Sequence, residues 1–136
     1  MMTTRPRNTP ERGSITAMLA VLAVALIAVI GLVYDGGSKI AAMQRADNAA
    51  AEAARAAGQY ITGADLIGGT GLDRTAAIAA AHTYLAEAGV NGNVSISGDL
   101  ITVTTTTTEA TVFLSIIGIT SVAGEGQATV RITEGL

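Results

Sequence analysis

A run without any charged side chain, Gly13–Tyr34, constrains this chain more than any other feature. Its core, Ile15–Val33, is almost wholly apolar, and as a helix that core would be about 28 Å long at roughly 1.5 Å per residue. This length matches the hydrocarbon thickness of a lipid bilayer. The sequence therefore predicts a transmembrane helix over residues 13–34.

Charges flank this segment asymmetrically. Arg5, Arg7 and Arg12 precede it with a single acid, Glu11, whereas the chain after it carries ten acidic and five basic residues. Basic residues concentrate on the cytoplasmic side of a membrane. We therefore expect a cytoplasmic basic tail over residues 1–12, one pass through the plasma membrane, and an extracytoplasmic remainder.

A cleaved secretory signal is the alternative interpretation of the apolar run. The apolar core of a signal peptide normally has about 7–15 residues and leads to a small-residue cleavage site. Here the run is longer, and the following sequence "GLVYDGG" (31–37) has no A-x-A pattern. A retained anchor is the favoured interpretation.

The anchor leads into an alanine-rich segment, residues 35–60, which predicts a long extracytoplasmic helix because alanine is the best helix former. Asp35 and Lys39 are spaced i,i+4, and Glu52 and Arg55 are spaced i,i+3, so both pairs favour a helix. Glycines should interrupt it. The pair at 36 and 37 predicts a soft point or kink just outside the membrane, and those at 58 and 63 predict the end of the helix.

Small residues recur at every fourth position of this helix, which places them on one face. They are Ala42, Ala46, Ala50, Ala54 and Gly58. Such a stripe lets another helix approach closely. The alternative is that the stripe reflects composition alone. We favour a packing role, with either the chain's own domain or a neighbouring molecule as the partner.

Residues 61–73 predict a glycine-rich connector. Its Gly63-x-x-x-x-Gly68 spacing lacks the lysine and hydroxyl residue that a phosphate-binding loop needs after it. A second helix should follow over about Arg74–Ala88, with Gly89 as its stop. His82 lies on this helix, and no second histidine or cysteine exists to share a metal with it, so we interpret it as structural.

After this helix the apolar period changes from 3.6 to 2. Val94–Ser97 and Leu100–Thr107 predict a β-hairpin, and alternation around Val130 predicts a final strand. Between them, residues 110–120 are apolar and too short to cross a bilayer, so we expect a short amphipathic helix that covers the sheet or rests on the membrane surface. Residues 74–136 should thus form a small α+β extracytoplasmic domain with a three-stranded antiparallel sheet.

Composition narrows the classes of function. The net charge of −3 argues against nucleic-acid binding, and only 3% of residues are aromatic, which leaves few groups for stacking bases or sugars. We can assemble neither a nucleophile nor an acid–base pair from the sequence. We therefore expect no enzyme, no cofactor and no metal site.

The order of these segments resembles a known family. "RGSITAMLAVLAVALIAVIGLVYDGGSKIAAMQRADNAAAEAARAAG" (Arg12–Gly58), followed later by "VFLSIIGI" and "GQATVRI", is similar to TadE/TadG-like proteins of the tight-adherence (Flp-type) pilus assembly system, of the actinobacterial type. The resemblance covers about Arg12–Ile132. It implies a pilin-like fold and a structural, non-catalytic role. Implied partners are other pilus-assembly membrane proteins, pilin-like subunits, membrane lipid and further copies of the chain.

The resemblance also raises the question of proteolytic processing. Pilins of this system are cut after a glycine, with a glutamate at the fifth mature position. A cut between Gly13 and Ser14 would place Met18 there, and Glu11 lies on the wrong side of Gly13. We therefore expect an unprocessed N-terminus. The competing hypothesis for function is a single-span anchored extracytoplasmic binding or sensory domain without a filament role.

Overall fold

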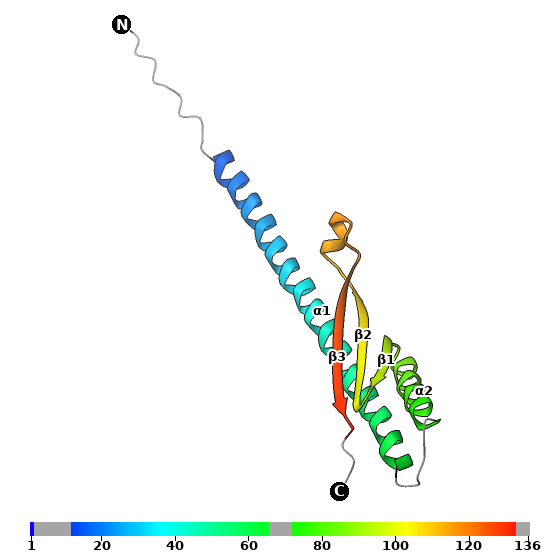
Figure 1. The fold of residues 1–136 in the computed structure, drawn as a ribbon. Helices are drawn as coiled ribbons and strands as arrows, with labels where there is room; N and C mark the ends of the chain where they lie inside the picture. Colours follow the sequence, from blue (N-terminus) through cyan, green and yellow to red (C-terminus); the bar gives the residue numbers. More distant parts are fainter. Residues whose placement is uncertain (2–11, 66–71, 133–136) are drawn as a thin grey trace.

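The chain folds around one long helix (Figure 1). The structure is a computed structural model that describes Met1, residues 12–65 and residues 72–132. The elements in order are α1 (Arg12–Asp65), α2 (Leu72–Glu87), β1 (Asn91–Ser97), β2 (Leu100–Ala110), the 3₁₀ turn η1 (Leu114–Ile117) and β3 (Ser121–Arg131). The predicted α+β class is confirmed. Arg5, Arg7 and Glu11 of the predicted basic tail lie outside the described residues.

Helix α1 runs for 54 residues without interruption, so the kink predicted at Gly36 and Gly37 is absent. A glycine costs a helix only about 1 kcal/mol relative to alanine. That is too little to break a helix that is apolar before the glycine pair and packed on a sheet after it. The predicted end at Gly58 is also wrong for the same reason, because the helix passes this residue and continues to Asp65. The predicted connector is helical at both ends, and its residues 66–71 lie outside the described residues.

Helix α2 begins earlier than predicted but ends as expected. Gly89 adopts a positive φ of 67°, its N–H donates to the carbonyl of Ala86, and the N–H of Val90 donates to the carbonyl of Leu85. This bond pattern closes a helix at a left-handed glycine, and it is usually accompanied by an apolar contact across the end. Leu85 and Val90 belong to the same buried cluster, so the stop also contributes to the core.

The three strands form an antiparallel sheet in the order β1-β2-β3, which confirms the predicted sheet. Strands β1 and β2 are joined by the two-residue turn Gly98-Asp99, where Gly98 has the positive φ of 60° that type II′ hairpins require. Both strands are longer than predicted. At the open end of the hairpin, β1 begins at Asn91 and β2 continues to Ala110, because Asn91 pairs with Thr106 and the last residues of β2 pair with β3.

Two helices cover one face of the sheet. α1 lies against β2 and β3, and α2 lies beside α1 against β1 (Figure 1). The inward positions of β2 begin with the fully buried Ile101 and Val103, and the core between the layers consists of alanines from both helices and aliphatic residues from the strands. The alanine-rich half of α1 is therefore part of the folded domain and not a separate stalk.

Candidate functional site

The predicted alanine stripe lies directly against the sheet. Ala42, Ala46, Ala50 and Ala54 are completely buried, and Gly58 is partly buried. The facing positions on β3 are glycines. A Cβ added at Gly124 would lie 2.3 Å from the backbone of Ala42 and Met43, and one added at Gly126 would lie 2.3 Å from the backbone of Ala46 and Asp47. No side chain fits between helix and strand at these two points.

Two threonines of β2 bond to the backbone of the helix across this contact. The hydroxyl of Thr105 donates to the carbonyl of Ala46 at 2.7 Å, and that of Thr107 donates to the carbonyl of Ala42 at 2.6 Å. Both threonines are buried. Buried hydroxyls need such partners, and close approach of the backbones brings the carbonyls within reach. We call Ala42, Ala46, Thr105, Thr107, Gly124 and Gly126 the seam.

A second contact lies where the apolar run of α1 ends. Asp35, the first residue after the predicted span, is only 1% exposed although it is charged. Its carboxylate accepts three backbone N–H bonds from the turn after β2: from Val112 at 2.9 Å, Phe113 at 3.0 Å and Leu114 at 2.6 Å. The i,i+4 spacing suggested that Asp35 would interact with Lys39 on the helix. Instead, its carboxylate binds backbone groups of the connection between β2 and β3.

Aromatic packing surrounds this carboxylate. A Cβ at Gly31 would lie 2.5 Å from Cγ of Phe113, so the Phe113 ring rests directly on the helix backbone. Tyr34 meets the same ring edge to face, with ring centroids 6.2 Å apart. We call Gly31, Tyr34, Asp35, the Phe113 ring and the backbone of residues 112–114 the latch. The latch fixes the connection between β2 and β3 to the last turn of the apolar run.

Two opposing effects act on the latch carboxylate. Burial raises the pKa of Asp35, but the three N–H donors lower it by more, so its pKa lies below the ordinary aspartate value. The pKa of Asp35 is thus lower in the folded state than in the unfolded state. The stabilisation that the Asp35 carboxylate gives the folded state is therefore fully present above the unfolded-state pKa, and it is lost as the pH falls through the folded-state pKa. At neutral pH the Asp35 carboxylate is therefore charged and keeps its hydrogen bonds to the backbone of residues 112–114.

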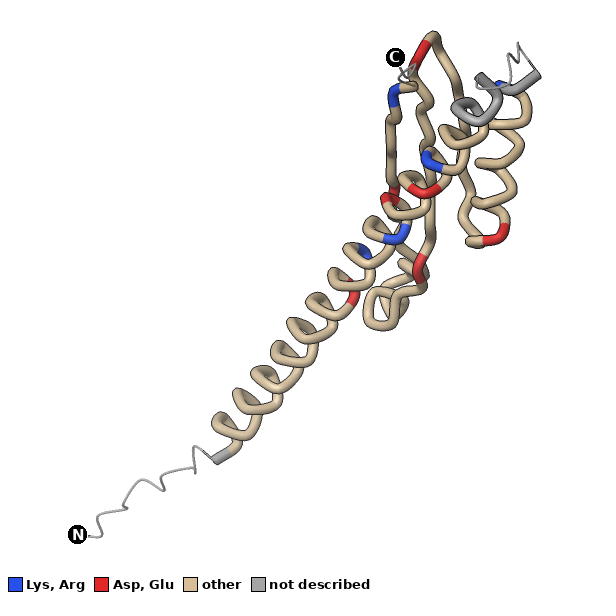
Figure 2. Tube along the Cα trace, turned by 90° about the horizontal axis from the view of Figure 1, so that it is seen from below, with Lys and Arg blue, Asp and Glu red and all other residues tan. Residues whose placement is uncertain are grey.

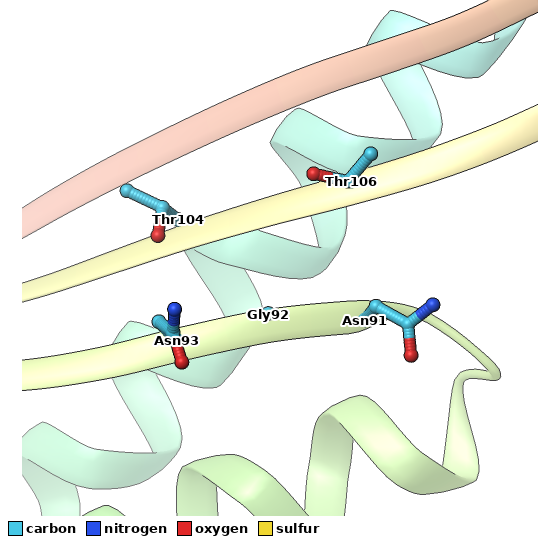
Figure 3. Close-up of a pocket in the computed structure, with 5 residues that line it drawn as sticks. All are labelled: Asn91, Gly92, Asn93, Thr104 and Thr106. Carbon is cyan, nitrogen blue, oxygen red and sulfur yellow. The ribbon is translucent and has the colours of Figure 1, made fainter.

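The outer face of the sheet carries mostly uncharged polar groups near its centre, and the one charged neighbour there among the described residues is Glu125 of β3, which pairs with Thr106. A depression there is lined by Asn91, Gly92, Asn93, Thr104 and Thr106, with the four side chains standing on β1 and β2 (Figure 3). Apart from Gly92, these residues are exposed. Amides and hydroxyls of this kind suit hydrogen bonding to another surface, and they provide no nucleophile–base pair.

The remaining predicted residues are spread over the surface. His82 is exposed on α2, and Gly13 and Ser14 are exposed in the first turns of α1. Within residues 12–65 and 72–132, no group of three His, Cys, Asp or Glu side chains is placed to hold a metal ion. Glu52 and Arg55 form the expected i,i+3 ion pair, with their nitrogen and oxygen 2.6 Å apart.

The sequence alone did not indicate the latch or the four strand residues of the seam. The period-2 alternation that starts at Ile101 and Val103, if continued, would place Thr105 and Thr107 on the inward face. An acid directly after an uncharged run is also a signal, because its charge must be satisfied close to the membrane. The three donors for Asp35 could not be inferred, since they are backbone groups almost eighty residues away.

These features define a class of protein: a chain with one N-terminal helix long and apolar enough to cross a membrane, whose other half is built into a small α+β domain. The family model described as putative Flp pilus-assembly TadE/G-like matches residues 13–59. The predicted resemblance to TadE/TadG-like proteins is thereby confirmed over these residues, which include Gly31, Asp35 and the alanine stripe. No curated protein and no solved structure matches the chain.

Proposed function

We propose that this chain is a membrane-anchored, minor pilin-like structural component of a tight-adherence (Flp-type) pilus assembly system. The observation that carries the proposal is the family match over residues 13–59, because those residues are the apolar run, the helix side of the latch and the helix side of the seam. The role is structural and not catalytic. The chain would act through protein–protein contacts made by an anchored, rigid domain.

The surfaces open to such partners differ from the one predicted. The alanine stripe is covered by the chain's own sheet, so Ala50→Leu would disrupt the domain before it could report on a partner. Two exposed surfaces in the described part of the chain suit such contacts. One is the exposed apolar helix surface between Ile15 and Val33, and the other is the polar outer face around Thr104 and Thr106. We assign contacts with neighbouring spans, including other copies of this chain, to the first and contacts between outer domains to the second.

The proposed topology places the N-terminus in the cytoplasm and the domain outside, because the basic residues Arg5, Arg7 and Arg12 precede the span. An alkaline phosphatase fused after Leu136 should be active in intact cells, since the enzyme folds only outside the cytoplasm. A cytoplasm-active reporter fused at the same residue is the control and should be inactive. The opposite pattern would reverse the orientation and exclude a role outside the membrane.

The pilus role is tested by deleting the gene in its host and counting surface pili by electron microscopy. We expect loss of pili, restored by the wild-type chain, while the amount of the major pilin in the membrane stays unchanged. A sensory domain would instead alter pilin synthesis, so the pilin level separates the two hypotheses. Normal piliation in the deletion strain would contradict the proposal.

A further inference from the structure

The connection between β2 and β3 is apolar and exposed. No charged residue lies between Glu109 and Glu125. Its aliphatic side chains point away from the fold: Val112 is 53% exposed, Ile116 82%, Ile117 72% and Ile119 46%. The predicted amphipathic helix over residues 110–120 is only the single turn η1, and it does not cover the sheet. We call residues 111–120 the tip.

The latch places the tip beside the end of the apolar run. Phe113 packs on Gly31 and Tyr34, and Asp35 binds the N–H groups of the turn. In Figure 1 the tip extends from the sheet towards the N-terminal half of α1. Figure 2 shows no charged residue on the tip, and none on α1 between Gly13 and Tyr34. The exposed aliphatic groups of the tip therefore continue the apolar surface of α1, including Ile30, at the level where that surface ends.

Seven of the ten backbone N–H groups of the tip donate to an acceptor within the protein. Besides the three N–H groups bound by Asp35, those of Thr111, Ile116, Gly118 and Ile119 donate to carbonyls of the tip at 3.1–3.2 Å. The Ser115 hydroxyl donates to the carbonyl of Val112 at 2.5 Å, and that of Thr111 donates to the carbonyl of Ile119. Internal bonding of this kind is what a segment in contact with a bilayer requires, because lipid offers no partner for backbone groups.

We infer that the tip inserts into the membrane, at the boundary between headgroups and acyl chains of the leaflet that the folded domain faces. Lipid is the occupant, because the tip continues the membrane-facing surface of α1 and has no charge. Tyr34 and Phe113 lie where aromatic residues favour the interface. The span and the tip would then hold the domain at two points and fix its tilt. This inference rests on the anchoring proposed above but not on the pilus role.

The test measures the depth of the tip in the full-length chain. The sequence has no cysteine, so single cysteines at Ile117, Val24 and Thr106 can each carry a polarity-sensitive fluorophore. All three residues are exposed, which leaves the fold intact. The proteins are placed in phosphatidylcholine–phosphatidylglycerol nanodiscs, where both membrane faces are open to solution. Quenching by iodide then reports water, and quenching by spin-labelled acyl chains reports lipid. A label at Ile116 repeats the measurement on the neighbouring residue.

We expect the label at residue 117 to be blue-shifted, quenched by lipid at roughly 5–10 Å below the headgroups, and severalfold less accessible to iodide than the label at 106. The inference is overturned if 117 behaves like 106 while Val24 is quenched by lipid. It is also overturned if 117 is shielded from both quenchers until the protein is diluted to one copy per disc, because a second copy would then cover the tip. Absence of lipid quenching at Val24 would overturn the anchoring as well.

Discussion

Replacing Gly126 by alanine should strongly destabilise the folded domain. The new Cβ would lie 2.3 Å from the α1 backbone at Ala46 and Asp47, where no flexible side chain can move aside. Overpacking of this kind costs about 3 kcal/mol. For a domain of this size the melting temperature, followed by circular dichroism in detergent, should fall by on the order of 10 °C. Gly124→Ala should behave in the same way against Ala42.

The matched control is Gly36→Ala. A Cβ there meets nothing within 4 Å, and alanine stabilises a helix interior by about 1 kcal/mol relative to glycine. Its melting temperature should therefore stay equal to that of the wild type or rise. Equal melting of Gly126→Ala and Gly36→Ala would mean that helix and strand do not meet at the seam.

Removing the latch carboxylate should release the tip while the rest of the domain stays folded. Asp35→Ala leaves three backbone N–H groups without their charged acceptor, and charge-assisted bonds are roughly twice as strong as neutral ones. Amide hydrogen exchange at Val112, Phe113 and Leu114 should accelerate on the order of tenfold or more. Exchange in β2 at Ile101 and Val103 should hardly change, because the seam is intact.

Asp47→Ala provides the control on the same helix. Asp47 is exposed and accepts one long bond, 3.3 Å from the N–H of Gln127. Its loss should alter exchange at that one amide and leave the tip unaffected. If Asp35→Ala and Asp47→Ala gave the same exchange at residues 112–114, the carboxylate would not be holding the tip.

The elements of the fold followed from local patterns, and their assembly did not. The uncharged run, the alanine-rich helix and the alternation around Val94, Ile101 and Val130 predicted an anchor, helices and three strands, because burial against one surface imposes those periods. The helix end predicted at Gly58 and the kink predicted at Gly36 and Gly37 were wrong, since propensity is weaker than tertiary packing.

The seam and the latch show why the rest could not be predicted. The alanine stripe was visible, yet a smooth helix face does not reveal whether its partner is a neighbour or its own sheet. That choice depends on Gly124 and Gly126, about eighty residues along the chain, and on the register that pairs them with Thr107 and Thr105. Likewise the acceptor of the latch is a side chain, whereas its donors are backbone groups that no residue type identifies.

We expect the apolar run of α1 and the folded domain to form one rigid unit, because an unbroken helix joins them. Electron paramagnetic resonance between spin labels on cysteines at Val24 and Thr106, in the otherwise cysteine-free chain, tests this rigidity most directly in lipid nanodiscs. Both positions are exposed, and they lie on either side of Gly36 and Gly37. A rigid unit predicts a single narrow distance distribution, which Gly36→Ala leaves unchanged. A broad or two-peaked distribution that narrows in Gly36→Ala would show a hinge at the glycine pair and contradict the account.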